Sequence, residues 1–202
     1  MDVGSIISNG IQKGFQNLLP LLVNFVLWAL TVWIPYLNVG TTICLFAALP
    51  IKMSKGETIS YTEIFNPIYR KRMGEVFITW FFVGSGVFLG MLFLIVPAFV
   101  IGIAWMLAVL LVIDKEKNPM EAIAESNRLT YGKKWTIFGG MFLLWLLIFV
   151  ASAIAGYILQ LIGKIPVIGG LINVAGMILI GGASASIFIG ATGYIYGELV
   201  RK

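Results

Sequence analysis

The 202-residue sequence contains no histidine and only one cysteine, Cys44. Without histidine, serines inside hydrophobic runs, such as Ser152, Ser184 and Ser186, have no imidazole to activate them as nucleophiles. A single cysteine cannot form an intramolecular disulfide and says nothing about the redox compartment. We therefore expect no catalytic residues, no metal site and no cofactor, and we predict that the protein is not an enzyme.

Charged residues are also scarce. They make up 11% of the chain, whereas soluble domains have roughly 25%, and 59% of the residues are hydrophobic. This composition predicts an all-α integral membrane protein. The net charge of +5 is typical of the cytoplasmic loops of membrane proteins, so it does not indicate a nucleic-acid partner. The N-terminal residues show no cleavage-site pattern, and we expect no removable signal peptide.

The hydrophobic runs predict one domain over residues 1–202, with six transmembrane helices arranged as three hairpins. A crossing needs about 20 apolar residues, and residues 3–17 precede the first run as a predicted interfacial helix. The predicted spans cover about 18–36, 39–55, 76–95, 97–113, 135–157 and 173–196.

The basic residues predict the orientation of these spans. All of them except Lys164 fall on one side of the six-span arrangement. Because positive charge marks cytoplasmic loops, we expect both termini in the cytoplasm, with the chain in the plasma membrane. Hairpins that enter the bilayer and return without crossing would also place these basic residues on one side. Because the second and fourth predicted spans are short, that alternative stays open.

Two charged segments, residues 55–75 and 114–135, each predict an amphipathic helix on the cytoplasmic side. In the second, Asn118 followed by Glu121 has the spacing of a capping box, and Gly132 is placed to end the helix. The first segment has similar signals 58 residues earlier, which predicts a pseudo-repeat. The matched positions are Ser60 with Asn118, Glu63 with Glu121, Arg70 with Arg128, and Gly74 with Gly132.

The face of the second charged helix can be predicted from its spacing. Met120, Ile123 and Asn127 fall on one stripe, which we expect to face the ends of the spans. Asn127 would then hydrogen-bond to exposed backbone there. Basic residues beside the two helices are expected at the level of the lipid headgroups, unless they only fix the direction of insertion. These residues are Arg70, Lys71, Arg72, Lys133 and Lys134.

Small residues recur at helical spacing in the third and sixth spans. Such faces usually allow close packing between helices. A groove for a lipid tail or a peptide is the alternative. The residues concerned are Gly86 and Gly90 in the third span, and Gly182, Ser186, Gly190, Gly193 and Gly197 in the sixth.

The segment P-A-F-V at residues 97–100 and the run from Val112 to Trp135 resemble a group of largely uncharacterised prokaryotic six-helix membrane proteins. That group is related to the membrane domain that precedes some glycerophosphodiester phosphodiesterases. The resemblance implies a fold and a membrane location, and structural roles for Ser126 and Gly132, but no substrate. It rests on Pro97, Glu121, Ala122, Ser126, Leu129 and Gly132.

The predicted spans contain no ionisable residue in their interior, which argues against a proton or ion pathway through them. We expect a protein that handles or senses a lipid or a hydrophobic peptide, or a membrane subunit of an export or stress-resistance system. The alternative is the substrate-binding membrane subunit of an energised transporter, which would have a cavity lined by polar and aromatic residues. The expected partner is membrane lipid, and the alternatives are another membrane subunit or a hydrophobic peptide.

Overall fold

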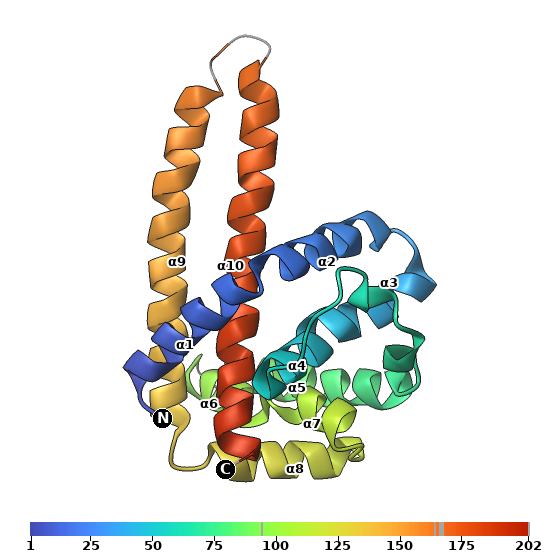
Figure 1. The fold of residues 1–202 in the computed structure, drawn as a ribbon. Coiled ribbons are helices and arrows are strands. Elements are labelled where there is room, and N and C mark those ends of the chain that lie inside the picture. The colour runs from blue at the N-terminus through green and yellow to red at the C-terminus, as the bar shows by residue number, and fades with distance from the viewer. Residues whose placement is uncertain (94, 164, 166–167, 202) are drawn as a thin grey trace.

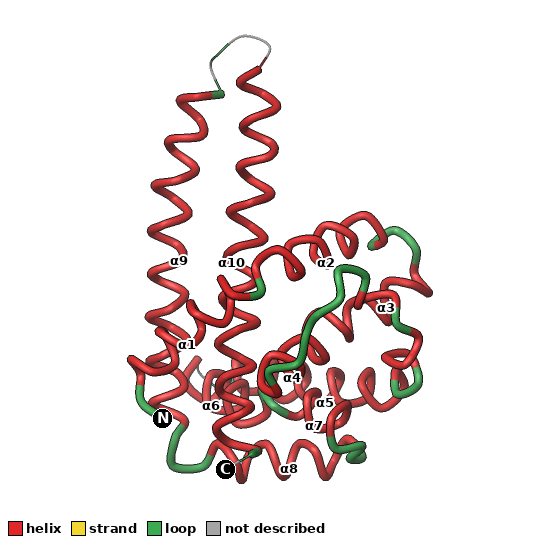
Figure 2. Tube along the Cα trace, viewed as in Figure 1, coloured by secondary structure: helices red, strands yellow, loops and turns green. Residues whose placement is uncertain are grey.

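The computed structural model describes residues 1–93, 95–163, 165 and 168–201, and every regular element among them is helical (Figures 1 and 2). The elements are α1 (Val3–Gln16), α2 (Leu18–Thr31), α3 (Pro35–Ile43), the π-helical turn η1 (Cys44–Ala48), α4 (Leu49–Lys55), the 3₁₀ turns η2 (Glu63–Phe65) and η3 (Pro67–Arg70), α5 (Met73–Leu92), α6 (Ile95–Trp105), α7 (Ala108–Asp114), α8 (Pro119–Thr130), α9 (Lys134–Ile162) and α10 (Ile168–Val200).

Within the described residues, five helical stretches are long and apolar enough to cross a membrane. They are Pro35–Lys55, which joins α3, η1 and α4, then α5, Ile95–Asp114, which joins α6 and α7, and finally α9 and α10. Helices α1 and α2 pass the same test only as a pair, and a bend of 77° separates them. Large apolar side chains are exposed on most of these helices, as expected for a surface in contact with lipid.

Helices α9 and α10 form a long hairpin that extends beyond the other helices, and both termini lie near its base (Figure 1). The hydroxyl oxygens of Ser152 and Ser184 lie 3.3 Å apart between the two helices. The predicted outward position of Lys164 lies outside the described residues. The base of the hairpin is covered by α1 and α4, while its far half is exposed on most sides.

Helix α1 packs across the base of this hairpin because glycine lets the backbones approach closely. A Cβ atom at Gly190 would lie 2.6 Å from the carbonyl oxygen of Gly10 and 2.9 Å from the amide nitrogen of Gly14. Ile6 is fully buried and fills the space above Gly140 on α9. The predicted helix at residues 3–17 is thus packed against both long helices.

The helical stretch formed by α6 and α7 is interrupted at residues 106–107, and Ser126 of α8 fills the interruption. Its hydroxyl donates to the carbonyl oxygen of Ala104 at 2.7 Å and accepts from the amide of Leu107 at 3.2 Å. A broken helix leaves such backbone groups without partners, so this buried serine satisfies both. The bonds also hold α8 against the break.

The predicted amphipathic helix in the first charged segment is wrong. The structure has two short 3₁₀ turns there, separated by Asn66, because Pro67 lacks an amide hydrogen and disfavours a helical residue before it. The amide of Ser60 does donate to Glu63, at 3.4 Å. Gly74 does not end a helix but lies in the first turn of α5. Gly56, with φ of 66°, ends α4 instead.

Helix α8 has the predicted ends but a different buried face. The side chain of Asn118 accepts from the amide of Glu121 at 2.9 Å, and Gly132 follows the helix with φ of 74°. Met120 and Asn127 are exposed, and Asn127 accepts from the ammonium of Lys134 rather than bonding to backbone. The face that packs inward consists of Ala122, Ile123, Ser126 and Thr130.

Candidate functional site

Two adjoining apolar hollows form a groove between α6 and α9. Their volumes are about 210 and 490 Å³, and Phe99, Ile103 and Phe138 line both. The smaller hollow extends past Val100 to the start of α9, and the larger one extends along α9 to Trp145. The groove therefore runs from the charged end of α9 into the apolar part of the molecule.

One wall of the groove is a ladder of aromatic side chains along α9. Residues three or four positions apart lie on the same helix face, and successive ring centroids are separated by 5.5 to 6.2 Å. Phe99 of α6 meets this ladder edge to face, 5.5 Å from Phe138. The ladder consists of Trp135, Phe138, Phe142, Trp145 and Phe149, of which the first four line the groove.

A lysine and a tryptophan lie where the groove reaches the charged end of α9. Lys134 and Trp135 both line the smaller hollow. The Lys134 ammonium donates to the side-chain oxygen of Asn127 at 2.9 Å, which uses one of its three hydrogens. A cation and an amphipathic ring at one end of an apolar groove are typical of a boundary between acyl chains and headgroups.

The other predicted headgroup residues lie elsewhere. The guanidinium of Arg70 lies over the ring of Tyr36, 5.1 Å from its centroid, and Arg72 donates to Glu116 at 3.3 Å. Lys71 and Lys133 are exposed. The basic residues before α5 and those before α9 therefore do not form one cluster.

The charged positions on α8 lie at its surface. Glu121 is exposed, and so is Arg128, whose guanidinium lies 3.6 Å from Glu125. Lys117 also pairs with Glu125. These pairs hold the loop before α8 against the outer face of the helix, away from the groove.

The small-residue faces are filled by neighbouring helices. Gly190 meets α1, and Gly193 meets α4, where a Cβ atom would lie 2.6 Å from the carbonyl oxygen of Pro50. Ser186 is fully buried and donates to the carbonyl of Gly182. The other contacts run from Gly182 to Leu22, from Gly197 to Ser54, from Gly86 to Trp105, and from Gly90 to Ala98.

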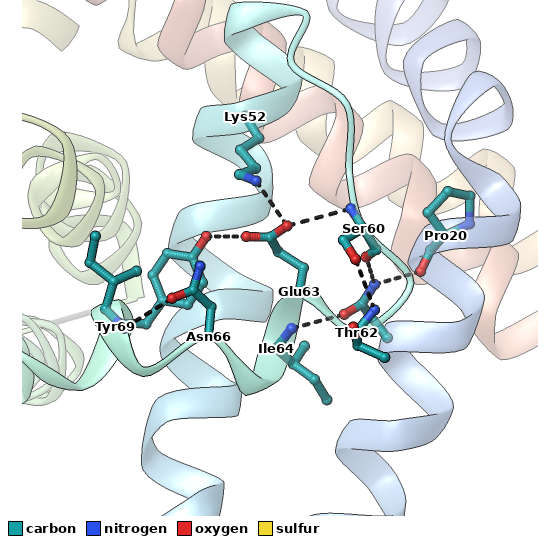
Figure 3. A network of polar contacts seen from close by, with 10 residues as sticks. Pro20, Lys52, Ser60, Thr62, Glu63, Ile64, Asn66 and Tyr69 are labelled. Carbon is teal, nitrogen blue, oxygen red and sulfur yellow. Dashed lines mark hydrogen bonds and ion pairs between the residues drawn. The ribbon is translucent and has the colours of Figure 1, made fainter.

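A second feature of the structure is a buried carboxylate, Glu63, between a lysine and a tyrosine (Figure 3). One oxygen of Glu63 lies 2.8 Å from the Lys52 ammonium, and the other accepts from the Tyr69 hydroxyl at 2.7 Å. Burial alone would raise the pKa of Glu63, but the bonds from Lys52 and Tyr69 outweigh it, and its pKa lies below the usual value. Burial and the nearby carboxylate both raise the pKa of Tyr69, so its hydroxyl stays a donor.

Asn24 of α2 holds the same segment from its other side. Its side chain is fully buried, accepts from the amide of Ile64 at 3.0 Å, and donates to the carbonyl oxygens of Ser60 and Pro20 at 2.7 and 2.8 Å. Pro20, Ser60 and Ile64 lie together around this point in Figure 3. The chain after α4 is thus fixed to both α2 and α4.

Asp114, at the end of α7, has an equivalent set of partners. Its carboxylate lies 2.5 Å from the Lys55 ammonium and accepts from the Tyr196 hydroxyl at 2.7 Å. Lys52 and Lys55 are one turn apart on α4, so this short helix pairs with two acids from different parts of the chain. Neither pair was predicted from the sequence. The available signal was an acid at the end of an apolar run.

These paired groups bond to one another, which favours a structural role. Among the residues that the structure describes, no group of three or more Asp, Glu or Cys side chains is arranged to hold a metal ion. The groove between α6 and α9 is therefore the better candidate for binding.

We predict that acid loosens the segment between α4 and α5. Because the pKa of Glu63 is lowered by folding, its contribution is present above the unfolded pKa of about 4.3 and is lost as pH falls through the lower folded value. Unfolding midpoints measured in detergent between pH 6 and pH 3 should fall less in Glu63→Gln than in the wild type. Glu121→Gln, on the exposed face of α8, should keep the full acid dependence. Equal pH dependence in all three proteins would contradict this role of Glu63.

Comparisons with protein-family models, curated protein sequences and solved structures find no match. The groove between α6 and α9 is therefore the feature that bears on function.

Proposed function

We propose that the protein is a non-enzymatic membrane protein that holds an acyl chain of an anionic phospholipid in the groove between α6 and α9. The observation that supports the proposal most directly is the apolar, aromatic-lined groove with the Lys134 ammonium at its charged end. In this arrangement the chain lies along Phe99 and Phe138, and the phosphate lies beside Lys134.

The groove has to select its lipid by shape and charge. A lipid tail in a bilayer is already out of water, so moving it onto an apolar wall gains little from the hydrophobic effect. The aromatic ladder offers a continuous surface for van der Waals contact. A basic group at an anionic surface adds roughly 1 kcal/mol. We therefore expect a modest preference for anionic over zwitterionic lipid.

The proposal includes a prokaryotic plasma-membrane location with the basic loops in the cytoplasm, and an internal pseudo-repeat. The order of elements supports the repeat, since α2, the α3–α4 stretch and the 3₁₀ turns are followed by α5, the α6–α7 stretch and α8. The irregular turn at Cys44–Ala48 lies 58 residues before residues 102–106, where the second stretch begins to break. In this scheme α6, which forms one side of the groove, corresponds to α3.

Filling the groove is expected to displace the lipid. Val100→Trp adds a large ring in the smaller hollow, and we expect several-fold less lipid retained on gently extracted protein, measured by native mass spectrometry. Val174→Trp is the matched control, because Val174 is an exposed valine on α10 away from the groove. Equal retention in the two variants would overturn the proposal. Retention of a peptide in place of lipid would also overturn it.

A further inference from the structure

The start of α6 lies beside the first residues of α9. Val96, in the first turn of α6, lines the same hollow as Lys134 and Trp135, and Phe99 contacts Phe138 one turn further along α9. In a six-span arrangement the start of α6 would lie on the opposite side of the membrane from Lys134. The hydrocarbon core is about 30 Å thick, so residues on its two sides cannot share a hollow of this size.

The other end of α5 also lies beside charged residues, those of the loop before α8 and of α8 itself. Arg72, directly before α5, donates to Glu116 in the loop between α7 and α8. Helix α8 packs along α5, α6 and α7, and its outer face carries exposed charges such as Arg128. Both ends of α5 are therefore next to charged segments that the distribution of lysine and arginine places on the same side of the membrane.

The first hairpin shows a similar conflict. Tyr36 lies in the first turn of α3 and would be at the far side of the membrane in a six-span arrangement, whereas Arg70 belongs to the segment expected in the cytoplasm. Yet the Arg70 guanidinium lies over the Tyr36 ring, and a Cβ atom at Gly40 would meet the Arg70 side chain at 2.7 Å. The bend of 77° before α2 turns this hairpin away from the direction of α1.

Among the described helices, α9 and α10 extend far beyond the level of α5, α6, α7 and α8 (Figure 1). Helix α9 has 29 residues and is therefore about 43 Å long, enough to cross the membrane with its headgroups. Its far half is exposed on most sides and carries apolar side chains such as Ile154, Ile158 and Leu161.

We infer that α9 and α10 alone cross the membrane, and that the α2–α4 and α5–α7 hairpins enter one leaflet and return to the side of α8. The partner of their exposed apolar faces is the acyl-chain layer of that leaflet. Helices satisfy their own backbone hydrogen bonds, so they can lie within a leaflet at no cost in unpaired groups. Phe81, Phe88 and Leu92 of α5 are exposed, and the inference places them against this layer. The inference rests on the membrane location and not on occupancy of the groove.

Side-specific quenching tests this topology in full-length protein inserted into liposomes. In a Cys44→Ala background, a fluorescent label is attached at one introduced cysteine per protein. The positions are Phe93, in the turn between α5 and α6, Trp33, in the turn between α2 and α3, and two references, Tyr131 after α8 and Ile165 at the far end of the α9–α10 hairpin. All four native side chains are exposed. An impermeant aqueous quencher is added to each side in turn.

We expect Tyr131 and Ile165 to be quenched from opposite sides, and Phe93 and Trp33 to be quenched more from the side of Tyr131. Greater quenching of Phe93 from the side of Ile165 would overturn the inference for the second hairpin, and the same result at Trp33 would overturn it for the first. Equal quenching from both sides, as for a label at the bilayer centre, would overturn it too. Because lipid retention in Val100→Trp is measured separately, the groove proposal and this topology can fail independently.

Discussion

Replacing Gly190 by leucine is expected to prevent α1 from packing on α10. The added side chain would start 2.6 Å from the Gly10 carbonyl oxygen and 2.9 Å from the Gly14 amide nitrogen. Both are backbone atoms, so no rotamer change relieves the overlap and the helices must separate. Overpacking usually costs roughly 1 to 3 kcal/mol, and a clash between two backbones belongs at or above the upper end of that range. We expect a fall of several degrees in the unfolding midpoint in detergent, or failure to accumulate.

Gly181→Leu is the matched control for this experiment. Gly181 lies on the same helix, and a Cβ atom built there meets nothing within 4 Å. Leucine is also a better helix former than glycine, so this variant should be neutral or slightly more stable. If Gly190→Leu were as stable as Gly181→Leu, the close contact between α1 and α10 would be wrong. The small-residue face would then be open to lipid or ligand.

Replacing Asp114 by asparagine is expected to have the second large effect. The side chain is 4% exposed and bonds to Lys55 and Tyr196, so losing its charge leaves Lys55 without its partner. Removing one member of a fully buried pair costs about 3 to 5 kcal/mol. Because Lys55 is 32% exposed, water screens part of this loss, and we expect about 2 kcal/mol in the free energy of unfolding.

The control is Glu116→Gln, two residues further on, where the side chain is 77% exposed and pairs only at the surface with Arg72. That change should cost well under 1 kcal/mol. The double variant Lys55→Gln with Asp114→Asn should be more stable than the sum of the two single changes predicts, because neither charge is then left unpaired. Additive losses would show that the two groups do not interact.

The helical nature of the long apolar runs and the ends of α8 could be predicted from the sequence, because apolar length and capping residues are local signals. Asn118 and Gly132 bound α8 within a residue of where the pattern places its ends. The interruption at residues 106–107 could not be predicted. It depends on Ser126, which lies about 20 residues away along the chain and becomes a backbone partner only when α8 packs beneath the break.

The groove and the paired charges could not be predicted from the sequence either. No local pattern links Lys55 to Asp114, and Phe99 and Phe138 resemble ordinary lipid-facing residues in their separate apolar runs. Their contacts depend on how the hairpins are oriented relative to α9 and α10. Hydrophobic length limits which segments enter a membrane, but it does not determine whether a hairpin crosses or returns.

The packing of α1 against α10 also has a consequence for how the chain is made. Gly10 and Gly190 lie 180 positions apart, so nearly the whole protein has to be synthesised before they can meet. At about 5 to 20 residues per second, the first helix waits roughly 10 to 40 s for its partner. During that time its glycine face is without the protein surface that later covers it. A chain that ends before α10 therefore leaves α1 without the helix against which its glycines pack.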